Sequence, residues 1–211
     1  MAAPNPPTPE PTKLVQLLDQ PMHDPREYLR SIGEVQAQAL TVKWDNPAEM
    51  ERLVTLRRGE HKPHRELKDA CLFACLMEQL MCGREDPDIR VKVVPPRDQD
   101  DDADAYLLWH DRVGQRFAPV QLKELPPEHL NARATLDELL LKLRKYPPSR
   151  QPPVVAVYTN RTMHVAEITV PAGLNVASLW LYGAVTPDAS RWCLLGDLLG
   201  TVGYRDLPLG L

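Results

Sequence analysis

Two strand-like segments on either side of a short turn restrict the fold of this chain more than any other feature. The segments are AYLLWH at 105–110 and RFAPVQLKEL at 116–125, with DRVG between them. A turn centred on Arg112 and Val113, followed by Gly114 as the residue of unusual backbone conformation, predicts a β-hairpin. Because the turn is short, its centre also sets the register of the two strands.

This register places three polar side chains at the open end of the hairpin. It sets Asp104 opposite Gln121 and Asp102 opposite Lys123. Opposed residues share a face of the sheet, and so do residues two apart, so Asp104, Gln121 and Lys123 are predicted to share one face. A slip of one residue would exchange the two faces, which leaves Asp102 and Asp104 as alternatives for the acidic position.

A carboxylate, an amide oxygen and an ammonium group at one strand end suit a divalent cation and a phosphate group. Mg²⁺ prefers oxygen ligands and typically takes one or two carboxylates beside waters and phosphate oxygens. Asp104 is the expected principal ligand, and the Gln121 side-chain oxygen is a weaker neutral one. The Lys123 ammonium group can orient the attacking water and stabilise charge that develops on the phosphate.

The rest of the pattern predicts a mixed α/β protein. The clearest helix begins at Pro63 and ends before Gly83, with an apolar stripe at spacings of three and four. Thr135 and Glu138 form a capping-box pattern at the start of a later helix. The other predicted elements are helices at 25–44 and 47–58, strands at 89–94, 154–159, 163–170 and 178–185, and a short closing element at 190–199.

In this order of elements the chain resembles the PD-(D/E)xK superfamily, which includes restriction endonucleases and repair nucleases. The matching elements are the helix 64–82, the strands 89–94, 104–110 and 116–124, the helix 135–146 and the strand 154–159. The resemblance covers roughly residues 60–165 and implies a restriction-endonuclease-like fold, a mixed central sheet flanked by helices. It also implies a hydrolase that uses Mg²⁺ or Mn²⁺ to cleave DNA.

The resemblance assigns a role to four residues. Asp104 matches the aspartate of the superfamily, Lys123 matches its lysine, and Glu66 matches a glutamate often found on the first helix. Gln121 takes the place of the second acid, which makes this a Gln-x-Lys variant with one negative charge fewer at the metal. Two alternatives stay open: a catalytically inactive member that binds nucleic acid or protein, and an unrelated α/β interaction protein.

The remaining features bound the surroundings of this domain. Residues 1–12 are rich in proline and predict a disordered tail, which leaves 13–211 as a single domain with extra N-terminal helices. A secretory signal and an apolar run long enough for a bilayer are not seen, so the expected location is the cytoplasm. Cys71 and Cys75 are expected to be buried small apolar residues, rather than zinc ligands with His61 and His64.

Charge is the main argument against nucleic acid as a partner. The chain carries 25 Lys and Arg against 29 Asp and Glu, for a net charge of −4, whereas phosphate binding favours a positive surface. Net charge averages over all faces, however, and two local stretches at 57–65 and 142–150 are basic. DNA therefore remains the expected partner, with no role expected for a membrane.

Overall fold

The structure is a computed structural model that describes residues 16–40, 62–82, 87–97, 102–128, 130–159, 161–186, 189–200 and 202–209. The predicted tail at 1–12 and the predicted helix at 47–58 lie outside these residues. So do residues 57–61 of the first basic stretch. The side chains of His61 and His64, the alternative zinc ligands, lie outside them as well.

Helices and strands follow one another in an order that begins with helices and ends with strands. The elements are α2 (Pro25–Leu40), α4 (Lys62–Cys82), β1 (Val91–Val94), β2 (Ala105–Asp111), β3 (Gly114–Leu125), α5 (Leu136–Leu143), β4 (Val154–Thr159), the 3-10 turn η2 (Val165–Glu167), β5 (Ser178–Ala184), β6 (Arg191–Gly196) and β7 (Gly203–Pro208). None of the helices in the described part of the chain combines the length and apolarity needed to cross a membrane.

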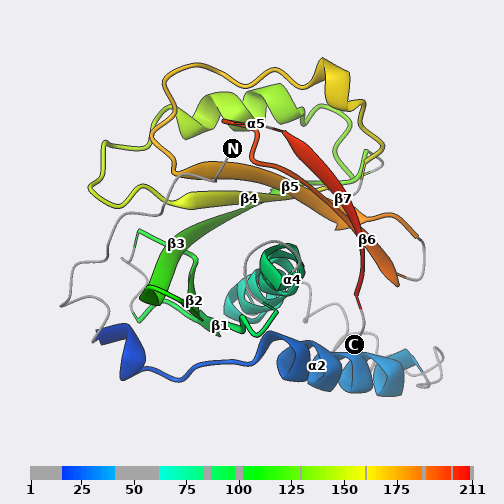
Figure 1. Ribbon diagram of the computed structural model, residues 1–211. Coiled ribbons are helices and arrows are strands. Elements are labelled where there is room, and N and C mark those ends of the chain that lie inside the picture. Colours follow the sequence, from blue (N-terminus) through cyan, green and yellow to red (C-terminus); the bar gives the residue numbers. More distant parts are fainter. Residues whose placement is uncertain are drawn as a thin grey trace.

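The strands form one seven-stranded mixed sheet in which every neighbour in space is also a neighbour in sequence. The β1–β2–β3 meander is antiparallel, β3, β4 and β5 run parallel, and β5–β6–β7 is again antiparallel. Figure 1 shows that the sheet curls around α4, while α5 lies on its outer side and α2 packs beneath α4. The expectation of a mixed α/β protein is confirmed.

The core between α4 and the inner face of the sheet depends on the apolar stripe predicted for this helix. Phe73 and Leu76 are fully buried there, and Phe73 packs on Tyr182 of β5 with ring centres 5.6 Å apart. Cys71 and Cys75 are 0% and 1% exposed, and burial raises the pKa of both thiols. They are buried small residues, as predicted.

The hairpin register predicted from the turn is confirmed. Asp111 pairs with Gly114, and the Asp111 side chain accepts hydrogen bonds from the N–H groups of Val113 and Gly114 at 2.8 and 3.0 Å. Gly114 has a φ of 141°, a conformation that favours glycine. Because the register holds, Leu107 and Val120 share the face that packs against α4. Leu108 and Phe117 pack in a separate cluster on the other face.

The predicted strand at 163–170 is wrong. This segment contains only η2, and the strand that pairs with β4 is β5. A parallel pair needs a crossover connection, and residues 160–177 supply it. Ile168 and Val170 pack with Leu140 and Leu143 of α5, so their apolar pattern serves the outer core rather than the sheet.

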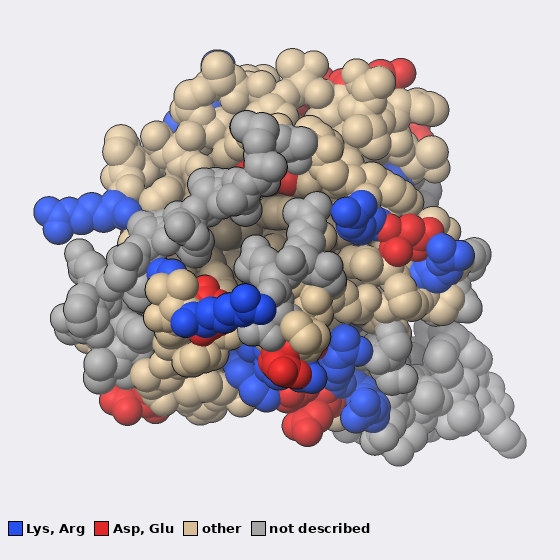
Figure 2. All heavy atoms as spheres, viewed as in Figure 1, with Lys and Arg blue, Asp and Glu red and all other residues tan. Residues whose placement is uncertain are grey.

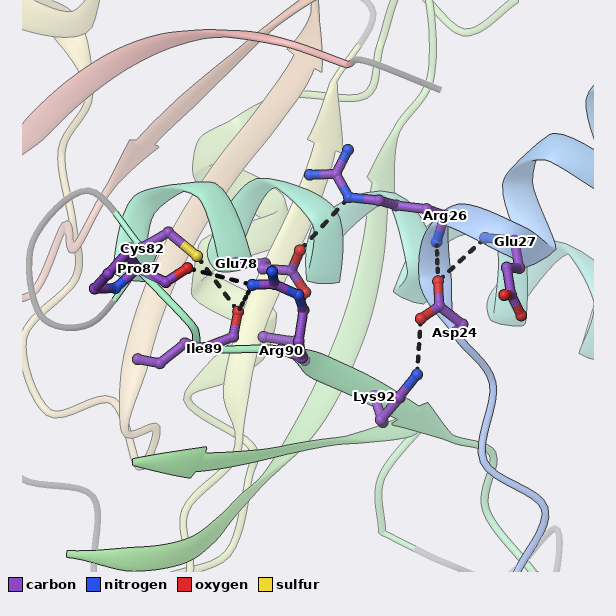
Figure 3. Close-up of polar contacts among 10 residues, drawn as sticks. Asp24, Arg26, Glu27, Glu78, Cys82, Pro87, Ile89, Arg90 and Lys92 are labelled. Atoms are coloured by element: carbon purple, nitrogen blue, oxygen red, sulfur yellow. Dashed lines mark hydrogen bonds and ion pairs between the residues drawn. The ribbon is translucent and has the colours of Figure 1, made fainter. Parts of the chain in front are cut away.

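Polar contacts attach α2 to β1 and α4 (Figure 3). Asp24 caps α2 by accepting from the N–H groups of Arg26 and Glu27, and it forms an ion pair of 2.7 Å with Lys92 of β1. The Glu78 carboxylate, 8% exposed, accepts from the Val91 N–H at 2.9 Å. These contacts attach the N-terminal cap of α2 to the first strand.

The segment before α2 also closes the outer edge of β1. His23 forms an isolated bridge with Val93, in which its N–H donates to the Val93 carbonyl at 2.8 Å. The Val93 N–H donates back to the His23 carbonyl at 3.0 Å. Since Glu78 accepts from Val91, both outward-pointing amide groups of this strand have acceptors.

Candidate functional site

The structure brings Asp104, Gln121 and Lys123 together, as the register predicts. Asp104 directly precedes β2, whereas Gln121 and Lys123 lie two apart on β3. The Lys123 Nζ lies 2.9 Å from the Gln121 Oε1 and 3.7 Å from the Asp104 Oδ2. A cationic group thus stands between an amide oxygen and a carboxylate.

Asp104 rather than Asp102 supplies the carboxylate of this group. The Asp104 Oδ2 accepts from the Leu122 N–H at 2.7 Å, so the side chain continues the ladder where the two strands separate. Asp102 has an exposed side chain and contributes its backbone carbonyl, which accepts from the Gln121 Nε2. Of the two alternatives, Asp104 therefore contributes a side-chain carboxylate to the group, and Asp102 contributes a backbone carbonyl.

Tyr146 is a fourth member, which the sequence did not point to. Its hydroxyl donates to the Gln121 Oε1 at 3.1 Å, and the Lys123 Nζ lies 5.9 Å from the centre of its ring. A signal was present: Leu136, Leu139 and Leu143 face the sheet at helical spacing, and Tyr146 continues their stripe three residues beyond the helix. That stripe predicts contact with β3.

These contacts fix the Gln121 side chain at both ends. Its oxygen accepts two hydrogen bonds, from Lys123 and Tyr146, which is the capacity of an amide oxygen. A cation bound to Gln121 would therefore displace at least one of these donors. The Lys123 and Asp104 side chains are 31% and 22% exposed, so solvent and ions reach the group.

Glu66, the fourth predicted residue, lies elsewhere. It belongs to α4, which packs on the face of β3 that carries Val120 and Leu122, whereas Gln121 and Lys123 belong to the opposite face. The Glu66 carboxylate acts electrostatically on Asp69 of the same helix. The contacts that join Asp104, Gln121 and Lys123 do not include it.

The donor set of this group is one carboxylate, one amide oxygen and one ammonium. Within the described ranges, His, Cys, Asp and Glu side chains do not gather in threes as a metal site would require. Mg²⁺ nevertheless binds sites with a single carboxylate, where waters and substrate oxygens complete its coordination. Asp104 with Gln121 fits that minimal kind of site.

Comparison of the chain with models of protein families, with curated proteins and with solved structures gives no match.

Proposed function

We propose that this protein is a Mg²⁺-dependent phosphodiesterase that cleaves DNA, with a PD-(D/E)xK-like fold in a Gln-x-Lys variant. The observation that supports this most is the convergence of Asp104, Gln121 and Lys123, with Nζ within 3.7 Å of the carboxylate and 2.9 Å of the amide oxygen. The order α4, β1, β2, β3, α5, β4 also agrees with the order that the resemblance implies.

In this proposal each side chain has one task. Asp104 and the Gln121 oxygen would hold the cation, which would replace one of the two donors to that oxygen and supply Lewis-acid chemistry at the phosphate. The Lys123 ammonium donates a hydrogen bond to the attacking water or to a phosphate oxygen and stabilises negative charge as the P–O bond breaks. Tyr146 and the Asp102 carbonyl orient the Gln121 amide, so that its oxygen faces Lys123.

A plasmid-cleavage assay with Mg²⁺ or Mn²⁺ tests the proposal. We expect the wild type to nick or linearise the plasmid, and Lys123→Ala to reduce the rate by at least about 100-fold, a loss comparable to that of one transition-state donor. Lys68→Ala removes a lysine of α4 and serves as the matched control with an unchanged rate. Cleavage that survives Lys123→Ala would falsify the assignment of the site.

A catalytically inactive binding protein of the same fold is the second candidate. One observation favours it: the Gln121 oxygen and the Asp104 Oδ2 already have donors within the protein. Gln121→Glu separates the two candidates, because it restores the second carboxylate. In an active enzyme this change lowers the Mg²⁺ concentration needed for half-maximal cleavage, whereas an inactive protein binds DNA without cleavage in either form.

A further inference from the structure

A stretch without acidic residues follows the helix beside the site. Between Glu138 and Glu167 the chain carries five Lys and Arg residues and no Asp or Glu, although acids outnumber bases in the whole chain. The five are Lys142, Arg144, Lys145, Arg150 and Arg161. A local excess of this kind produces a positive surface that the net charge of −4 conceals.

Four of these five side chains are exposed on the surface. Lys142, Arg144, Lys145 and Arg150 are exposed, and we call these four residues the basic strip. Arg161 is partly buried instead, and its guanidinium donates to the backbone carbonyls of Pro126 and Asn131. On the face seen in Figure 2, by contrast, many of the coloured Lys and Arg side chains stand beside Asp and Glu.

Tyr146 joins the basic strip to the candidate site. It directly follows Lys145, and its hydroxyl donates to Gln121. Consecutive Cα atoms are about 3.8 Å apart, so Arg144 and Lys145 begin within about 8 Å of the Tyr146 Cα. The basic strip therefore adjoins, along the chain, the residue whose hydroxyl and ring contact Gln121 and Lys123.

Helix stability alone does not account for the strip. Cations in the last turn of a helix favour its dipole by about 0.3–1 kcal/mol, and Lys142 is the one basic residue in the last turn of α5. Lys145 and Arg150 lie beyond the helix. Arg150 stands between the proline pairs 147–148 and 152–153, which restrict the backbone of this connection before any ligand arrives. A preorganised segment loses less entropy on binding.

We propose that the basic strip binds the phosphate backbone of DNA on one side of the Asp104–Gln121–Lys123 group. This inference rests on the proposed function, since the group is where the scissile phosphate would lie. It adds the path of the strand: along the end of α5 and the connection to β4, over Tyr146.

Binding without catalysis tests the inference separately from the proposed function. The full chain is titrated onto a fluorescent duplex of about 25 base pairs in EDTA, over a range of NaCl concentrations. Each phosphate contact contributes about 0.9 to the slope of log K against log salt. We expect Arg144→Gln with Arg150→Gln to reduce this slope by about 1.8, and the variant lacking all four charges to reduce it by about 3.6.

Arg97→Gln with Arg205→Gln removes the same charge from exposed positions outside the strip and serves as the matched control. We expect it to change the slope by less than about 0.5, because in this proposal Arg97 and Arg205 make no direct contact with the phosphates. Equal losses in both double variants would show that only net charge matters and would overturn the inference, as would a wild type that does not bind the duplex. Binding to phosphatidylserine vesicles but not to DNA would also overturn it, by assigning the strip to a membrane surface.

If the strip variants lose binding to the duplex and the wild type does not cleave the plasmid, the proposal for the strip stands and the proposed nuclease activity fails. If cleavage depends on Lys123 but is unchanged in the strip variants, the proposed nuclease activity stands and the proposal for the strip fails. The two proposals can therefore fail independently.

Discussion

Gln121 has more polar contacts than any other side chain of the candidate site. Its oxygen accepts from Lys123 and Tyr146, and its amide nitrogen donates to Asp102. An amide is the one side chain here that can do both, because a carboxylate in its place could not donate to a carbonyl. Gln121 thus has a structural role in this group that a glutamate in its place could not fulfil.

The hydroxyl of Tyr146 can be tested without any assay of activity. We expect Tyr146→Phe to lower the free energy of unfolding by about 0.5–1.5 kcal/mol, the usual contribution of one neutral hydrogen bond. A double-mutant cycle with Gln121→Ala, measured by urea denaturation, should give a coupling energy of similar size. A coupling below about 0.3 kcal/mol would mean that the contact contributes nothing, and that Gln121 is oriented by its other partners.

For individual residues of the site, the sequence predicts those positions that follow from a local rule. The turn at 112–113 was sufficient to align Asp104 with Gln121, since hairpin pairing follows from turn length. It could not reach Tyr146, which meets Gln121 only through the packing of α5 on the sheet. The role of Glu66 is implied by the resemblance alone, and whether this residue reaches the group depends on which face of the sheet α4 covers.

Among the elements, the junction of α2, α4 and β1 depends on one buried carboxylate. Glu78 accepts from the Val91 N–H at 2.9 Å and lies 3.5 Å from the Arg26 Nε. The Arg26 side chain is 35% exposed, so its ion pair contributes little. The hydrogen bond from the Val91 N–H contributes more, because its loss leaves a buried donor without a partner.

Two substitutions distinguish these contributions. Glu78→Ala removes the acceptor, and we expect it to lower the free energy of unfolding by about 1–3 kcal/mol. Glu78→Gln keeps an oxygen for Val91 and removes only the charge, so its expected cost is below about 1 kcal/mol. Equal losses in the two variants, measured by urea denaturation, would instead assign the effect to the ion pair with Arg26.

The elements that could be predicted are those whose apolar pattern follows directly from their own burial. The bounds 154–159 of β4 agree with the structure, because an apolar run between prolines and polar residues specifies a buried strand. The strand predicted at 163–170 was wrong, because apolar residues in a similar pattern also occur in a segment that packs on a helix. No strand was predicted at β7, because most of its residues are exposed and give no alternating apolar pattern.

For the whole molecule, the curl of the sheet around α4 places an acid in a partly buried position. Asp69 of α4 lies within electrostatic reach of Glu124 and Glu66. Burial, with a smaller contribution from these acids, raises the pKa of Asp69 to about 6, although Lys68 opposes the shift. A carboxyl group with a raised pKa favours the folded state only while it is protonated.

The stability of the protein should consequently fall with pH in a defined window. Between about pH 4 and pH 6 the folded state holds a proton that the unfolded state has released, so the free energy of unfolding decreases as the pH rises. Asp69→Asn cannot titrate, and we expect it to be more stable than the wild type above pH 6. The gain is at most about 3 kcal/mol, and it disappears near pH 4.

Urea denaturation at pH 4.5, 6 and 7.5 measures this difference, with Asp19→Asn as the control at an exposed position. A difference between Asp69→Asn and the wild type that is constant across this range would mean that the Asp69 carboxyl group titrates normally. The mixed α/β class was predictable from the sequence, but this acid was not. Its environment exists only once the sheet has wrapped around the helix.

The bridge between His23 and Val93 leaves the two edges of the sheet unequal. The outward amides of β1 are occupied, whereas β7 ends the sheet among the described strands. Among the described strands this leaves β7 as the edge at which a further strand can pair, and addition at one edge alone cannot propagate a stack. Under stress that preserves the fold, association by strand pairing should therefore end at a two-fold β7–β7 pair rather than extend into a fibre.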